Sequence, residues 1–88
     1  MPFDMKHAGP DALDRLEPLL GEVRKIAALK ERSRGVFYRS ARAFLHFHEH
    51  GDAFFADMRV GNDFQRFETT TAAQRVAFLS ALKRALAQ

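Results

Sequence analysis

The middle of the chain changes its hydrophobic period, and this change restricts the fold more than any other feature. Between residues 36 and 70, apolar or aromatic side chains alternate with polar ones, and turn-forming residues recur about every ten positions. On either side of this stretch, apolar residues recur every three or four positions, as on one side of a helix. We therefore predict a two-layer α+β domain with an N-terminal helix, a four-stranded antiparallel meander and a C-terminal helix, in which both helices cover one face of the sheet.

The strands are predicted from the turns between them, which fall at Ser40-Ala41, Gly51-Asp52 and Gly61-Asn62-Asp63. We expect strands at residues 35–39, 42–50, 53–59 and 64–69. Phe64 and Phe67 are out of phase with each other in the last strand, which predicts a β-bulge there.

The helix boundaries are predicted from proline, glycine and capping residues. A proline in a helix interior clashes with the preceding turn, so we expect a short turn at residues 11–16 and a main helix that starts near Glu17, with Pro18 at its first position. Residues 33–35, which include Gly35, are expected to end this helix. The second helix is expected to begin at Thr71, because Thr71 and Gln74 have the spacing of a capping box.

Composition limits the classes of protein that fit. The chain has 88 residues, of which 47% are hydrophobic, enough for one core, so we predict one domain over residues 1–88 with residues 1–10 flexible. It has no cysteine, which excludes disulfides, thiolate metal ligands and thiol nucleophiles. No apolar run is long enough to span a bilayer, and the first ten residues do not resemble a signal peptide, so we expect a cytoplasmic protein.

Positive charge is concentrated in one stretch of the chain. The net charge is +3, but residues 24–42 contain seven cationic side chains and a single acidic one, Glu31. Part of this cluster is explained by the end of a helix, where solvated cationic side chains interact favourably with the helix dipole. The alternative is a contact for phosphate groups, for which Arg34, Arg39 and Arg42 are the candidates.

The strand predicted at residues 42–50 raises the question of function. Side chains alternate between the two faces of a strand, so Leu45 and Phe47 are expected to face the helices. The other face would then present six residues from this strand and the next one: Phe44, His46, His48, Phe55, Asp57 and Arg59. Two aromatic rings among ionisable groups indicate a surface that something covers, and we name this set the outer-face residues.

Two kinds of site with a bound ligand are consistent with the outer-face residues. Histidines two apart on a strand can chelate zinc or another divalent ion, with Asp57 or His50 as the third ligand beside His46 and His48. A nucleic-acid surface would instead stack bases on the two aromatic rings and hold phosphates with the arginines Arg39, Arg42, Arg59 and Arg66.

Catalysis and protein association are the other two alternatives. A histidine oriented by Asp57 could act as a general base, but no nucleophile motif accompanies it, so we expect a protein that is not an enzyme. A protein interface, most simply a twofold homodimer, explains exposed aromatics without any cofactor. We therefore predict a binding module that associates through the outer face, with a metal site at His46, His48 and Asp57, or a nucleic-acid site, as alternatives.

Three segments also resemble a known group of sequences. They are FLHFHE at residues 44–49, ADMR at residues 56–59 and FQRF at residues 64–67. In this order they are similar to a group of short uncharacterised bacterial proteins that share FLHFHE, ADxR and FxRF. The resemblance covers about half of the chain and implies that His46, His48, Asp57 and Arg59 act together. It implies no activity, and His50 stands where the group usually has an acidic residue.

Overall fold

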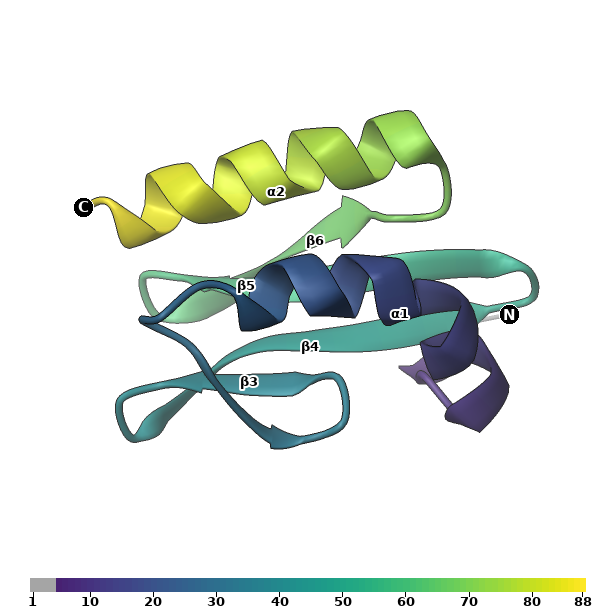
Figure 1. Cartoon of the computed structure of the whole chain (residues 1–88), viewed down its shortest axis with the longest axis horizontal. Helices are drawn as coiled ribbons and strands as arrows, with labels where there is room; N and C mark the ends of the chain where they lie inside the picture. The colour runs from purple at the N-terminus through teal and green to yellow at the C-terminus, as the bar shows by residue number, and fades with distance from the viewer. Residues whose placement is uncertain (1–4) are drawn as a thin grey trace.

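The computed structural model describes residues 5–88 and shows an α+β fold with two helices and an antiparallel sheet (Figure 1). The predicted fold class is thus confirmed. In chain order the elements are β1 (Lys6–His7), α1 (Pro10–Arg24), β2 (Lys30–Ser33), β3 (Val36–Arg39), β4 (Arg42–His50), β5 (Ala53–Val60), β6 (Asp63–Glu68) and α2 (Ala72–Leu86).

The sheet is a meander in which strands β2 to β6 lie side by side in sequence order. The short strand β1 pairs with β4, so β4 has β3 and β1 along one edge and β5 along the other. Four strands were predicted, and the structure adds β1 and β2. Residues 1–10 were expected to be flexible. Of these, residues 1–4 lie outside the described residues, whereas β1 is part of the sheet.

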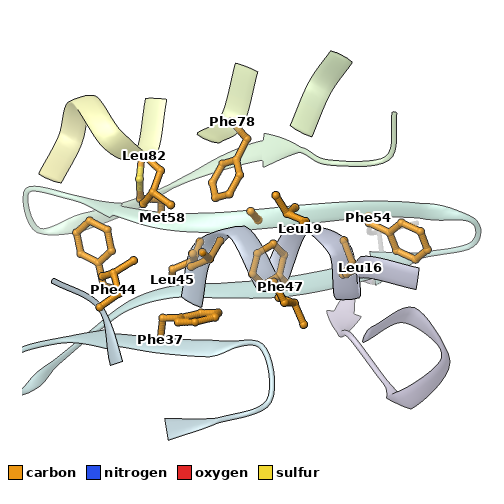
Figure 2. Close-up of a cluster of buried hydrophobic side chains, with 14 of the residues drawn as sticks. Leu16, Leu19, Phe37, Phe44, Leu45, Phe47, Phe54, Met58, Phe78 and Leu82 are labelled. Atoms are coloured by element: carbon orange, nitrogen blue, oxygen red, sulfur yellow. The ribbon is translucent and has the colours of Figure 1, made fainter. Parts of the chain in front are cut away.

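Both helices pack on one face of the sheet and bury a single apolar core (Figure 2). The sheet contributes alternate residues of β4 and β5, as their periodicity predicts. The largest of these buried side chains are Leu45, Phe47, Phe54 and Met58. From the helices, Leu16, Leu20, Phe78 and Leu82 are buried against them. The opposite face of the sheet, called the outer face below, carries the residues in between.

Helix α1 begins earlier than predicted. It starts at Pro10, which occupies the first turn, and Pro18 lies inside the helix. An interior proline loses one helical hydrogen bond and costs about 3 kcal/mol. The apolar stripe that includes Leu16 and Leu20 is fully buried on both sides of Pro18. We infer that this packing offsets the local cost, so the prediction of a helix starting near Glu17 was wrong.

The segment after α1 forms a strand, although it was predicted as helix. The helix ends at Arg24, and Lys30–Ser33 pairs with β3 as the edge strand β2. Gly35 makes the turn with φ of +80°, and a Cβ atom there would lie 2.7 Å from Leu13 of α1. The Glu31 carboxylate also accepts a hydrogen bond from the Gly35 amide at 2.9 Å. Glycine therefore allows both the hairpin and its contact with the helix.

A β-bulge changes the position of Phe44. In the pairing of β3 with β4, Phe37 lies opposite Leu45, but Tyr38 lies opposite Ala43, which leaves Phe44 as the extra residue. The side chain of Phe44 is therefore buried in the core, with only 6% of its surface exposed, instead of pointing to the outer face. No register shift occurs between β5 and β6, so the bulge predicted in the last strand is absent there.

Helix α2 begins as predicted. Thr71 is its N-cap, its hydroxyl accepts from the Gln74 amide at 3.1 Å, and the Gln74 side chain accepts from the Thr71 amide at 3.0 Å. No helix within residues 5–88 is long and apolar enough to cross a membrane.

Candidate functional site

Four strands bring polar side chains together on the outer face, on the side of the sheet away from both helices. His46 of β4 lies opposite Asp57 of β5, and Asp57 lies opposite Arg66 of β6. On the other edge of β4, His48 lies opposite His7 of β1. Residues directly opposite each other in an antiparallel pair project from the same face, so these five side chains form one group. We call this group the histidine cluster.

Strand β1 has only two residues and is held by contacts at its end. The Ala8 amide donates to the Phe47 carbonyl at 3.0 Å, and the Gly9 amide donates to Glu49 Oε2 at 2.7 Å. The Glu49 side chain thus fixes the junction between β1 and α1. This contact gives Glu49 a role in the fold and holds His7 beside His46 and His48.

Three histidines of the cluster lie close enough to share a ligand. Each of His7, His46 and His48 offers one ring nitrogen as a possible ligand atom. These three nitrogens lie within 4.8 Å of one another. The shortest separation joins His46 Nδ1 and His48 Nε2, at 2.9 Å. The ring centroid of His7 lies 4.6 Å from that of His48 and 5.7 Å from that of His46. His7 is exposed and His48 is buried, so the group is open on the side of His7.

Asp57 is the buried carboxylate of the cluster. Arg66 donates two hydrogen bonds to it, from Nε to Oδ1 at 2.8 Å and from a terminal nitrogen to Oδ2 at 2.9 Å. His48 Nε2 lies 3.3 Å from the same Oδ2 atom. Burial alone would raise the pKa of Asp57, but the hydrogen bonds and charge of Arg66 and the two histidines lower it below its ordinary value. Asp57 is therefore an anion next to two imidazoles.

His46 and His48 of β4 favour the neutral form. Burial lowers the pKa of His46, the nearby His48 lowers it further, and Asp57 opposes the change. Burial also lowers the pKa of His48, and His7 and Arg66 add to this effect while Asp57 again opposes it. Neutral imidazoles keep a lone pair on one ring nitrogen, which is the form that binds a metal ion.

The ring of His48 lies among several polar groups. Its Nε2 is near both His46 and Asp57, and a contact with the Lys6 backbone opposes the lowering of its pKa by burial. In the contact between His46 and His48, one of the two nitrogens must carry the proton. A metal ion could take the place of that proton.

The remaining outer-face residues lie beside the cluster or outside it. Phe55 is half-buried opposite His48, on the same face. Arg59 lies opposite Phe64, with its guanidinium 4.7 Å from the ring centroid, and the Phe64 ring is 4.8 Å from that of His46. Phe44 lies in the core on the other face, so its predicted place among the outer-face residues is wrong.

The structure also separates the arginines that were predicted to contact phosphate. Arg34 pairs with Asp14 and Glu17 of α1. Arg39 and Arg42 lie opposite each other at the ends of β3 and β4, and neither forms an ion pair within residues 5–88. Arg34 therefore has carboxylate partners in the fold, while the other two cations remain available.

The predicted metal ligands are thus brought together, and one more is added. His46, His48 and Asp57 are neighbours, as strand alternation predicts. The third histidine is His7 and not His50, which lies outside the group of three. The sequence carried no periodic signal for His7, because a two-residue strand is too short to show alternation. Only the pairing of β1 with β4 brings it to the site.

Comparisons of the chain with protein-family models, with curated proteins and with solved structures found no match. The resemblance to a bacterial sequence group therefore stays a prediction.

Proposed function

We propose that the protein binds a divalent transition-metal ion through His7, His46 and His48 on the outer face. One observation carries the proposal: a ring nitrogen of each histidine lies within 4.8 Å of the other two, although the three residues come from two separate strands. In a tetrahedral zinc site with Zn–N bonds of about 2.0 Å, ligand nitrogens lie roughly 3.3 Å apart. Rotation of the exposed His7 ring would supply the adjustment that a metal requires.

The donor set defines the kind of metal. The three proposed ligands are imidazoles and the chain has no cysteine, so soft ions that need thiolates are disfavoured. Imidazole suits Zn²⁺, Cu²⁺ and Ni²⁺. Asp57, 3.3 Å from His48 Nε2, supplies negative charge for the cation, either as a fourth ligand or as an acceptor for a metal-bound water.

The test is a calorimetric titration of the tag-free chain with Zn²⁺, with the His7→Ala, His48→Ala and His50→Ala variants measured in parallel. We expect one equivalent to bind. Second-shell changes commonly lower metal affinity by 10–100-fold, so removing a ligand should lower it by at least about tenfold. The matched control is His50→Ala, which removes the other histidine of β4 and should leave the affinity within about twofold.

Two results would refute the metal site. One is the absence of saturable binding by the wild-type chain with Zn²⁺, Ni²⁺ and Cu²⁺. The other is an equal loss of affinity in His50→Ala and His7→Ala, which would mean that scattered histidines bind the ion. Circular dichroism of each variant separates loss of the site from loss of the fold.

Protein association through the outer face is a second candidate function. It is supported by Phe64, of which 40% is exposed beside the cluster, and by Arg59 and Glu68, which form no ion pair with each other or with another described residue. Glu68 lies opposite Phe55 and so shares the face with Arg59. In a twofold homodimer these opposite charges could pair between copies. Sedimentation should then show a dimer that Phe64→Ser and Arg59→Ala weaken, and a monomer at all concentrations would refute this function.

A further inference from the structure

A hollow lies at the end of the sheet, and none of the residues of the histidine cluster line it. It is formed where the β3–β4 turn and the β5–β6 turn approach the C-terminal end of α2, all at the left of Figure 1. Its volume is about 340 Å³. Its apolar wall is formed by Phe44, Val60 and Ala85, and its polar wall by Arg39, Arg42 and Arg59. We call it the sheet-end pocket.

The bulge in β4 contributes to the shape of this pocket. Because the extra residue turns the Phe44 ring to the helix side, the ring lies at the edge of the core (Figure 2) and lines the hollow. The Arg39 guanidinium lies 5.8 Å from the centre of this ring. Arg59 also lines the pocket; its Nε donates to the Ala43 carbonyl at 2.8 Å, and its guanidinium lies 4.7 Å from the centre of the Phe64 ring. Two of the three cations are therefore held in place by the fold.

The three arginines of this pocket have no carboxylate partner among the described residues, in contrast to three arginines elsewhere in the fold. Arg24, Arg34 and Arg66 each form ion pairs with aspartate or glutamate. Within residues 5–88, Arg39 and Arg42 form none, nor does Arg59, and no aspartate or glutamate lines the pocket. Three cations that face one hollow repel one another, and a bound anion would remove this repulsion.

We infer that the sheet-end pocket binds a small molecule through its phosphate group. Guanidinium groups match the oxygens of a phosphate in a bidentate manner, and three of them suit a doubly charged group. Pockets for small ligands have volumes of about 300–1,000 Å³, so this pocket accommodates a phosphate with a small organic part against Phe44 and Val60. The inference is independent of the metal site, which uses none of these residues.

The experiment is a titration of the full chain with inorganic pyrophosphate in metal-free buffer, followed by NMR of the arginine Nε–H groups. We expect saturable shifts at Arg39, Arg42 and Arg59. Arg42→Ala removes charge-assisted hydrogen bonds to the phosphate, so it should lower the affinity at least about tenfold. Arg42→Lys should recover only part of it, because lysine keeps the charge without the planar fork.

The matched control is Arg34→Ala, which removes the same charge from an arginine that lies outside the pocket. Its affinity for pyrophosphate should stay within about twofold of the wild type. Equal losses in Arg34→Ala and Arg42→Ala would overturn the inference, since they would indicate general electrostatic attraction. Shifts that do not saturate would overturn it as well, and so would salt-sensitive binding of single-stranded oligothymidine without binding of pyrophosphate. His7→Ala should bind pyrophosphate normally, which keeps this test separate from that of the metal site.

Discussion

The two faces of β4 use neighbouring residues for different purposes. Leu45 and Phe47 are almost fully buried against the helices, whereas His46 and His48 point to the side without helices and contact groups of β1 and β5. The covered face is closed by apolar packing. The outer face instead brings three histidines and the carboxylate of Asp57 together. One strand can therefore contribute both to the stability of the fold and to a binding site, because its alternate side chains point to opposite faces of the sheet.

The largest effect is expected on the covered face. Phe47 is 3% exposed and packs against Phe78, with ring centroids 6.2 Å apart. Phe47→Ala should lower the free energy of unfolding by about 3 to 5 kcal/mol, because it removes a buried ring and leaves a cavity. The neighbouring change His46→Ala should cost about 1 kcal/mol or less. Urea unfolding of both variants measures the contrast, and similar losses would contradict the division between the faces.

The next prediction tests the bulge that moves Phe44 from one face to the other. Phe44→Ala should lower the free energy of unfolding by about 3 kcal/mol. This loss is at the lower end of the range for replacing a buried phenylalanine by alanine, because the Phe44 ring borders a pocket. On strict alternation, the ring would be on the outer face and its loss nearly neutral. Urea unfolding distinguishes the two positions, with Phe64→Ala as the control for a phenylalanine at the outer face.

A smaller effect is expected for the carboxylate of the outer face. Asp57→Asn removes the charge that holds Arg66 and lies beside His48, so it should cost about 1 to 2 kcal/mol of stability. It should also lower the affinity for Zn²⁺ by about tenfold, as for other groups next to metal ligands. Urea unfolding and calorimetry measure the two effects. Asp63→Asn, at the exposed start of β6, is the matched control, and an equal loss there would contradict the prediction.

The smallest effect is expected at the solvent-exposed rim of the covered face. Hydrogen bonds from Arg24 and then Arg34 lower the pKa of Glu17 from 4.5 to about 2. A lowered carboxyl pKa contributes stability that is complete above pH 4.5 and is lost as the pH falls towards 2. Because Glu17 is exposed, this contribution is small. Carboxyl NMR titration should show the low pKa, and Arg24→Ala should raise it.

The control for this titration is Lys25→Ala. Lys25 pairs with Glu22 and not with Glu17. The pKa of Glu17 should therefore remain near 2 in this variant. A pKa of Glu17 close to 4.5 in the wild-type chain would refute the exposed network.

Much of the fold was predictable because its signals are local. Alternation in residues 36–68 predicted strands β3 to β6, and except for Phe44 the buried apolar residues of β4 and β5 lie on the predicted face. The capping box at Thr71 predicted the start of α2, because its two hydrogen bonds join residues three apart. The neighbourhood of His46, His48 and Asp57 followed from the same alternation, since each strand directs every second side chain to one face.

The rest depended on contacts between distant parts of the chain. Packing on the sheet decided that α1 continues through Pro18, and pairing with β3 decided that residues 30–33 form a strand. An extra residue in β4 moved Phe44 into the core, and two residues of β1 brought His7 to the cluster. The sequence by itself thus determined the α+β class and the histidines of β4. Only the tertiary structure decided the third histidine and the unpaired arginines, because their partners lie far apart in the sequence and local propensity carries no information about them.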